Sequence, residues 1–226
     1  LTVLAITLLT AGVFLYKDKL VTIETNYVFD MYVFSVQWGR TMCVSAGSDC
    51  QTRLANIPTN EVSIHGLWPS LKSGTRLPDC HSGTDIPVKD DGSDVFLKMR
   101  KYWPSLTGAN EKFWVHEFNK HGYCYSEDQK TYFGKTLDVF LSKGINKLIL
   151  NAFGEQSGMY SVEVSELTSK LQGVLGGNYF STTCKSVNKK QYLQEIRLTL
   201  GTDFNFISLS GGSSCSKKKN QYILNT

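Results

Sequence analysis

The stretch NYVFDMYVFSVQW, residues 26–38, decides the fold class of the chain. It is rich in Val, Tyr and Phe and lacks a polar face at helical spacing, which is typical of a strand buried on both sides. We therefore expect it to be the central strand of a sheet. Residues 62–64 predict a second, short strand that stops at Gly66 and Pro69, so that His65 lies at a strand end, where functional groups are common.

Helical patterning dominates the middle of the chain, between segment boundaries rich in Gly and Pro. The expected helices cover residues 95–103, 110–121, 129–143, 145–153 and 162–175. The last quarter returns to short strands, at residues 192–200, 205–209 and 221–224. This order of elements predicts an α+β fold, in which an antiparallel β-sheet packs beside a group of helices.

Length and composition favour one folded domain. The 226 residues, 41% of them apolar, can bury a sizeable core, and the net charge of +4 favours a polyanionic partner without requiring one. Residues 1–16 are uncharged and precede the charged residues 17–19, a pattern typical of an export signal. We assign residues 1–20 to a signal peptide or N-terminal hydrophobic segment, either cleaved or kept as an anchor, and residues 21–226 to the domain.

A cleaved signal predicts a secreted protein, or one delivered to an acidic, lysosome-like compartment, with no stable membrane association. The cysteines agree with export. Their even number predicts three disulfides among fifteen possible connectivities, and the absence of a CxxC pair argues against a zinc knuckle or a thioredoxin-like site. The six are Cys43, Cys50, Cys80, Cys124, Cys184 and Cys215.

Three of the four histidines fall in two short segments, SIHGLWPS (63–70) and FWVHEFNKHGYC (113–124). On an α-helix, with about 100° per residue, the polar residues of the second segment project over less than half the circumference. They are His116, Glu117, Lys120 and His121. Such a face is often merely solvated. Here Phe113 and Trp114 border it, which favours the lining of a cleft.

Two kinds of chemistry fit these residues. His-Glu opens the HExxH signature of zinc proteases, but the second histidine stands at i+5 and Lys120, at i+4, would repel the metal. Cleavage of RNA fits better, because the 2′-hydroxyl already lies beside the phosphorus and needs only a base, an acid for the leaving oxygen, and donors for the phosphate. His65 would approach from another element across the cleft. We therefore expect no metal and no organic cofactor.

The two segments resemble the paired signatures of the T2 ribonucleases, HGLWP at residues 65–69 and HEWxKHG at residues 116–122. The resemblance extends to residues 36–38 and to YLQEI at residues 192–196, and it covers most of the chain from about residue 26. It implies the α+β fold of that family. It also implies a monomeric endoribonuclease that acts on single-stranded RNA with little base preference.

The resemblance implies a role for each matching residue. His121 would take the 2′-hydroxyl proton and His65 would protonate the leaving oxygen, although the assignment could be reversed. Glu117 and Lys120 would stabilise the pentacovalent phosphorane, and His116 would hold the phosphate. The product would be a 2′,3′-cyclic phosphate, formed in a lyase-type step and then hydrolysed to a 3′-phosphate. The alternative is a secreted binding or signalling protein that keeps the fold, with catalysis lost or secondary.

Substrate contacts and disulfides also follow from the resemblance. Trp68 and Trp114 would lie partly in the core and partly in the site, where an aromatic face can stack on a base. Ser70 stands where some relatives carry a base-reading acidic residue, and Phe118 replaces the usual Trp, so base preference cannot be transferred. The implied disulfide pairs are Cys43–Cys50, Cys80–Cys124 and Cys184–Cys215.

Overall fold

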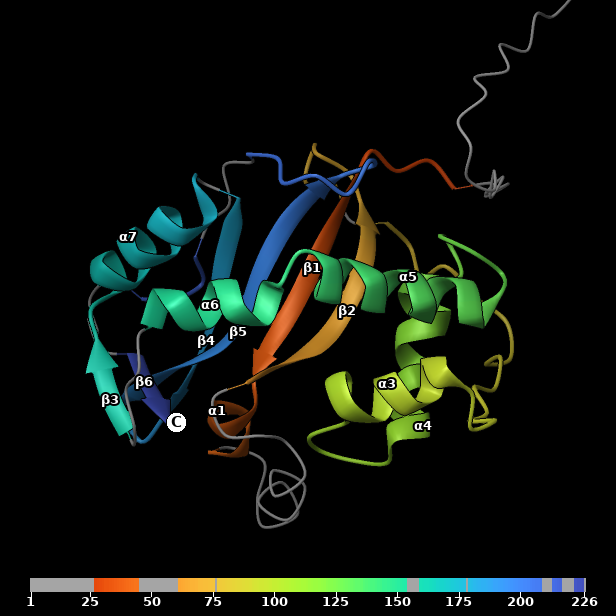
Figure 1. Cartoon of the computed structure of the whole chain (residues 1–226), viewed down its shortest axis with the longest axis horizontal. Coiled ribbons are helices and arrows are strands. Elements are labelled where there is room, and N and C mark those ends of the chain that lie inside the picture. Colours follow the sequence, from red (N-terminus) through yellow and green to blue (C-terminus); the bar gives the residue numbers. More distant parts are fainter. Residues whose placement is uncertain are drawn as a thin grey trace, which may run out of the picture.

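The computed structural model describes residues 27–44, 61–75, 77–153, 159–177, 179–208, 213–216 and 222–225. It has the predicted α+β architecture (Figure 1). The strands are β1 (Met31–Trp38), β2 (Val62–Ser70), β3 (Met159–Val162), β4 (Phe180–Val187), β5 (Lys190–Gly201) and β6 (Tyr222–Asn225). The helices are α1 (Gly39–Cys43), α3 (Asp94–Tyr102), α4 (Asn110–Glu117), α5 (Gln129–Ser142), α6 (Ile145–Phe153) and α7 (Val164–Leu175), with a π-helix, η1 (Phe118–Gly122), directly after α4.

The strands form one sheet in the order β2-β1-β5-β6-β3, and β4 also pairs with β5. Strand β1 pairs antiparallel with both β2 and β5, which confirms the predicted central strand from Met31 onward. The sheet is antiparallel except at Gln191, where β5 meets β6 in parallel.

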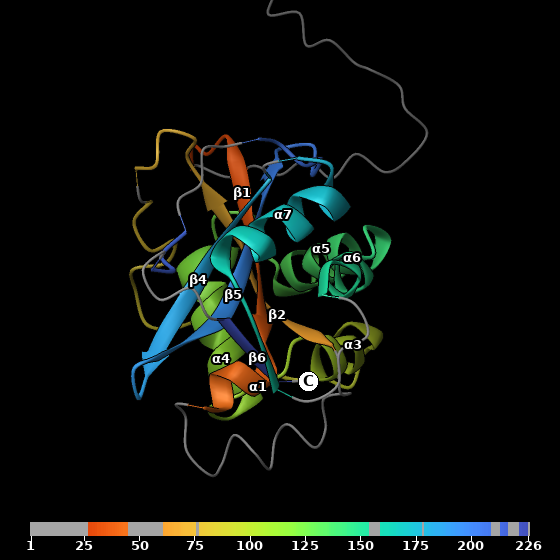
Figure 2. The same ribbon diagram turned by 90° about the vertical axis from the view of Figure 1, so that its left-hand side faces the viewer.

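The two faces of the sheet differ in polarity. On β1, Phe34, Val36 and Trp38 belong to the apolar core, and α5, α6 and α7 lie over this face of the sheet (Figures 1 and 2). Since side chains alternate along a strand, Ser35 and Gln37 lie on the opposite face. That second, polar face carries the site described below.

Strand β2 is longer than the sequence predicts, and His65 lies within it rather than at its end. Ser35 of β1 pairs with Gly66 and Val36 pairs with Ile64, so His65 is the extra residue of a β-bulge. A bulge turns a side chain away from the regular alternation, and such features are common next to active sites. Pro69 is compatible with the strand because β2 lies at the edge of the sheet.

Side chains from the helices cover the free edge of β2. The indole of Trp103 donates to the carbonyl of His65 at 2.7 Å, and the hydroxyl of Tyr132 donates to the carbonyl of Leu67 at 3.1 Å. Asn146 accepts from the amide of Val62 at 2.9 Å. Because these backbone groups have partners, the strand that carries His65 is fixed although it lies at an edge.

The expected α-helix over residues 110–121 changes type at residue 118. The amide of Tyr123 donates to the carbonyl of Phe118 at 2.9 Å, the i→i+5 contact of a π-turn. The side chain of Asn119 compensates for the interruption, because its amide donates to the carbonyls of Val115 and Ile86 at 2.8 and 3.0 Å. The predicted α-helical angles between His116 and the residues of η1 are therefore wrong.

Other differences concern short or polar elements. The sequence patterns did not predict α1 and β4. Strand β3, which was also not predicted, begins before the helix expected at residues 162–175. Within the described part of residues 205–209, only an isolated bridge from Phe206 to Leu200 forms. The predicted segment 1–20 lies outside the described residues. No helix among those that the structure describes is long and apolar enough to span a membrane.

The disulfide predictions are confirmed where the structure can test them. Cys80 is bonded to Cys124, and Cys184 is bonded to Cys215. The predicted partner of Cys43, at residue 50, lies outside the described residues.

Candidate active site

The polar face of the sheet and the end of α4 enclose a cavity of about 660 Å³. Strand β2 provides His65, Trp68 and Ser70, α4 provides His116 and Glu117, η1 provides Lys120 and His121, and β5 provides Arg197. The structure thus brings together the predicted site residues of both sequence segments, with the exception of Trp114.

Trp114 was expected to lie partly in the site, and the structure places it elsewhere. Its side chain is fully buried in the core, where its indole donates to the carbonyl of Trp103 at 2.8 Å and its ring packs against Phe96. It does not line the cavity. Trp114 therefore supports the fold, and the expected base contact by this residue is wrong.

His65 lies between two carboxylates that come from different elements. Its Nδ1 is 2.5 Å from Oε1 of Glu195 on β5, and its Nε2 is 3.4 Å from Oε1 of Glu117 on α4. The imidazole is 22% exposed, whereas Glu117 is fully enclosed at 1%. Both ring nitrogens consequently face acceptors, which favours the doubly protonated imidazolium.

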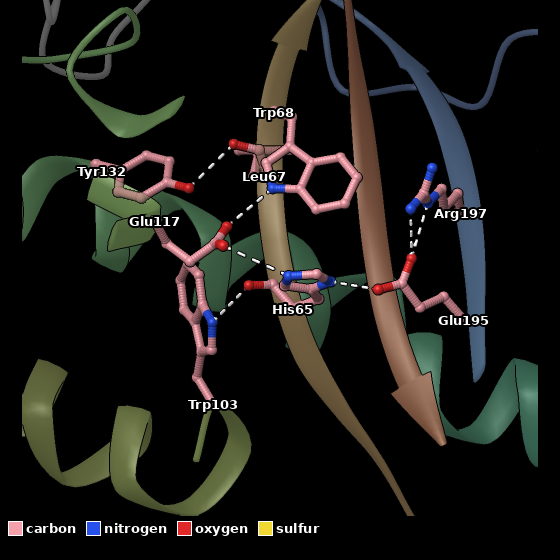
Figure 3. A network of polar contacts seen from close by, with 8 residues as sticks. All are labelled: His65, Leu67, Trp68, Trp103, Glu117, Tyr132, Glu195 and Arg197. Atoms are coloured by element: carbon pink, nitrogen blue, oxygen red, sulfur yellow. Dashed lines mark hydrogen bonds and ion pairs between the residues drawn. The ribbon is translucent and has the colours of Figure 1, made fainter. Parts of the chain in front are cut away.

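The two carboxylates are linked to one another through Arg197 and Trp68 (Figure 3). The guanidinium of Arg197 donates to Oε2 of Glu195 through Nε and Nη2, at 2.8 and 2.7 Å. It also lies 5.1 Å from the centre of the Trp68 ring, whose indole donates to Oε2 of Glu117 at 2.9 Å. We call these five residues, His65, Glu195, Arg197, Trp68 and Glu117, the contact cycle.

The electrostatic environments of the two histidines have opposite effects. Although burial opposes its protonation, the hydrogen bonds that the imidazole donates to Glu117 and Glu195 raise the pKa of His65 to about 9. Burial lowers the pKa of His121 to about 4, with the positive charge of Lys120 adding to the effect. Near neutral pH His65 therefore carries a proton and His121 is neutral.

The carboxylates stay ionised in this arrangement. Burial opposes ionisation of Glu195, but the contact with His65 and the charge of Arg197 lower its pKa to about 2. Burial likewise opposes ionisation of Glu117, whose pKa is lowered chiefly by its hydrogen bond with His65. The site thus combines two negative charges with a charged and a neutral imidazole.

Close packing fixes the cycle and η1. A Cβ atom at Gly66 would collide with Nε1 of Trp68 and Oε2 of Glu117, so only glycine allows these two groups to meet there. The Cys80–Cys124 disulfide joins the segment around residue 80 to the chain just beyond η1. Next to this disulfide, the amide of Cys80 donates to the carbonyl of Lys120 at 3.1 Å. This bond holds η1 against the segment around residue 80.

Glu195 and Arg197 were not predicted as site residues. The pattern YLQEI predicts a strand, in which Glu195 and Arg197 stand as opposite charges at i and i+2. Residues with this spacing point to the same face of a sheet. This spacing in the sequence indicates that the two charges share one face of β5. Only the pairing of β5 with β1 shows that this face of the sheet meets His65.

Among the described residues, no group of three or more His, Cys, Asp or Glu side chains is arranged to hold a metal ion. The chemistry that the site can perform is acid–base chemistry. A neutral imidazole accepts a proton, a charged one donates a proton, and Lys120 and Arg197 present positive charge to an anion in the same cavity.

The fold and the site define an α+β protein whose cavity pairs a protonated His65 with a neutral His121 for acid–base chemistry. Residues 29–222 match the model of the Ribonuclease T2 family, and the chain belongs to this family. The intracellular ribonuclease LX of Solanum lycopersicum is 34% identical over 136 residues, which cover 59% of this chain and 56% of the relative. Ribonuclease T2 of Homo sapiens is 26% identical over 162 residues, or 68% of this chain and 59% of the relative.

The chain thus spans less than two thirds of the length of these two relatives, whereas its match to ribonuclease Oy of Magallana gigas covers 89% of that protein at 28% identity. Solved structures agree on the fold. Ribonuclease MC1 from bitter gourd seeds superposes with a TM-score of 0.67 at 24% identity, covering 86% of this chain and 99% of that one. The SF11-RNase of Nicotiana alata superposes with a TM-score of 0.70 at 22% identity, covering 88% of this chain and 100% of that one.

Proposed function

We propose that this protein is an endoribonuclease that cleaves single-stranded RNA by transphosphorylation. The observation that carries the proposal is the pairing, in one cavity, of a protonated His65 with a neutral His121. Membership of the Ribonuclease T2 family supports the activity. Nucleotide complexes of ribonuclease MC1 variants, with 5′-UMP and with 5′-GMP, support binding of RNA by this fold.

In the first step the neutral His121 removes the proton of the 2′-hydroxyl, and the 2′-oxygen attacks the adjacent phosphorus. The bond from phosphorus to the 5′-oxygen breaks as His65 donates its proton to that oxygen. The products are a 2′,3′-cyclic phosphate and a free 5′-hydroxyl. In the second step water attacks the cyclic phosphate with the two histidines in exchanged roles, which leaves a 3′-phosphate.

The surrounding charges lower the barrier of the first step. Lys120 and His116 line the cavity as donors for the non-bridging oxygens, whose negative charge increases in the phosphorane. The negative charge of Glu117 favours the protonated form of His121. Glu117 therefore stabilises the imidazolium that forms when the 2′-hydroxyl proton is transferred.

Trp68 and Ser70 are the proposed base contacts that remain. Both line the cavity, and the Trp68 ring lies 5.0 Å from the His65 ring and 5.1 Å from the His121 ring. A base stacked at the exposed part of this indole would place its ribose near both histidines. The hydroxyl of Ser70 donates to the carbonyl of Trp68 at 3.0 Å and carries no charge with which to select a base.

We further propose that the enzyme is secreted, or delivered to an acidic endomembrane compartment, and acts as a monomer. The two disulfides are typical of proteins that fold in an oxidising compartment.

The test is digestion of a defined oligoribonucleotide in EDTA, with analysis of the ends. We expect cyclic phosphate ends that convert slowly to 3′-phosphates, and no cleavage of the matching deoxyribonucleotide, which lacks the nucleophile. His65→Ala and His121→Ala should each lose about 10²-fold or more in rate, whereas His81→Ala, at a histidine outside this cavity, should cleave normally. A folded wild-type protein without cleavage would favour the binding or signalling alternative.

A further inference from the structure

Glu195 is the one carboxylate of the contact cycle that does not line the cavity. It is 7% exposed, lies on β5 behind His65, and reaches only the Nδ1 side of the imidazole. Substrate in the cavity would contact the opposite, Nε2 side of the His65 imidazole. Glu195 is therefore placed to act on the reaction through His65 and not by touching the RNA.

The geometry fixes which nitrogen of His65 can donate the proton. Since Nδ1 is occupied by Glu195 at 2.5 Å, only Nε2 is directed toward Glu117 and the cavity. The carbonyl of His65 is held by Trp103 at 2.7 Å, so the backbone at the bulge is fixed as well. A hydrogen bond to one ring nitrogen sets both the orientation and the protonation of the other.

Arg197 fixes Glu195 in turn. Two of its N–H groups bind Oε2, so that Oε1 remains directed at His65. The two residues stand at i and i+2 on β5 and share the polar face of the sheet. Arg197 also packs on Trp68, which connects this pair to Glu117 on the far side of His65.

We propose that Glu195, held by Arg197, is a positioning residue that orients His65 through Nδ1 and keeps its Nε2 protonated for donation to the leaving 5′-oxygen. The inference rests on the proposed ribonuclease function, in which His65 is the general acid. It adds Glu195 and Arg197, from the last third of the chain, to a site that the sequence places in two segments, at residues 63–70 and 113–124.

Titratable and charged groups surround His65 from each part of the chain that encloses the cavity. Glu117 and His116 lie on α4, Lys120 and His121 on η1, Glu195 with Arg197 on β5, and Asp79 on the loop that follows β2. Hydrogen bonds that the imidazole donates to the two carboxylates together raise the pKa of His65. Removal of the charge of Glu195 leaves Glu117 in place, so we expect the pKa of His65 to fall without returning fully to its ordinary value.

Glu195→Gln tests this proposal, because glutamine keeps the shape of the side chain and removes its charge. Glu166→Gln on α7 is the matched control, since Glu166 pairs with Lys170 on the surface and does not line the cavity. Each variant is assayed on a ribodinucleotide, whose alkoxide leaving group needs a proton, and on a ribonucleoside 3′-nitrophenyl phosphate, whose leaving group needs none.

We expect Glu195→Gln to lose about 10- to 100-fold in kcat on the ribodinucleotide, within the range of a general-acid contribution. KM and the rate on the nitrophenyl substrate should change by less than about threefold, and the alkaline limb of the pH profile should move to lower pH. Equal losses on both substrates would show a merely structural role and overturn the proposal. Unchanged cleavage of the ribodinucleotide would overturn it as well.

A second measurement separates this proposal from the proposed function. NMR titration of the histidine ring protons gives the pKa of His65 without any turnover. If the wild type cleaves neither substrate, the ribonuclease proposal fails, whereas an identical His65 pKa in wild type and Glu195→Gln overturns the role of Glu195 alone. Should Glu195→Gln not fold, Glu195→Asp, which withdraws the carboxylate from Nδ1, enters the same comparison of two substrates.

Discussion

Replacing Gly66 by alanine should separate Trp68 from Glu117, although neither residue is itself changed. The added Cβ would overlap Nε1 of Trp68 and Oε2 of Glu117, the two atoms that form a hydrogen bond of 2.9 Å. Neither group can move away freely, because Glu117 is 1% exposed and Trp68 packs against His65 and His121. The methyl group must therefore break the bond or displace β2.

The expected cost follows from two contributions. Loss of a hydrogen bond to a buried carboxylate costs about 1.5–3 kcal/mol, and forcing a methyl group into a packed site costs about 1–3 kcal/mol. We expect Gly66→Ala to lower the free energy of unfolding by about 3 kcal/mol or more. Cleavage of RNA should fall about tenfold or more, because Glu117 also faces His65 and a general-acid step contributes at least this much.

Urea denaturation and a cleavage assay measure the two effects. The matched control is Gly173→Ala within α7, where an added Cβ meets nothing within 4 Å and alanine should stabilise the helix by about 0.5–1 kcal/mol. The same chemical change should thus have opposite effects at the two positions. If Gly66→Ala unfolds at the urea concentration of the wild type and cleaves RNA at the wild-type rate, the argument from close packing is refuted.

Three further predictions concern stability and pH. Joint replacement of Cys80 and Cys124 by serine opens a loop with a sequence separation of 44. The free energy of unfolding, measured by urea denaturation, should fall by about 4 kcal/mol, and an unchanged urea midpoint would contradict this prediction. Asp128→Ala removes the N-cap of α5, whose carboxylate accepts from the amide of residue 131 at 2.9 Å, and should cost about 1 kcal/mol, detectable as a lower melting temperature. The pH profile of kcat/KM should fall below about pH 4, where His121 becomes protonated and can no longer accept a proton. It should also fall above about pH 9, where His65 loses the proton that it must donate. A profile with a single limb would show that only one of the two histidines titrates in the reaction.

Much of the fold could be predicted because apolar periodicity determines it. Strands β1 and β5 and helices α3, α5, α6 and α7 coincide with apolar patterns to within a few residues. Strand β4 could not be predicted because its sequence, FSTTCKSV, is mostly polar and shows no alternation of apolar residues. The end of β2 was placed too early because Gly66 and Pro69 usually break a strand, whereas a bulge and an edge position accommodate both here.

The site was predictable to the extent that its residues are adjacent in sequence. His116, Glu117, Lys120 and His121 lie within six residues, and any helical form of this segment directs them toward one side. The π-turn could not be foreseen, because it depends on contacts that Asn119 makes with a distant loop. Glu195 could not be assigned either, since its role depends on the pairing of β5 with β1, which is a property of the tertiary structure.

The sequence distance between His65 and Glu195 has a consequence for synthesis of the protein. These two residues are 130 positions apart, and contacts of such long range form late in folding because closing the intervening loop costs entropy. A nascent chain that ends before β5 contains both signature segments but lacks the partner of Nδ1. The proposed nuclease site would thus be incomplete while the growing chain is close to the RNA that encodes it, and enzymatic activity would report the folding of the whole sheet.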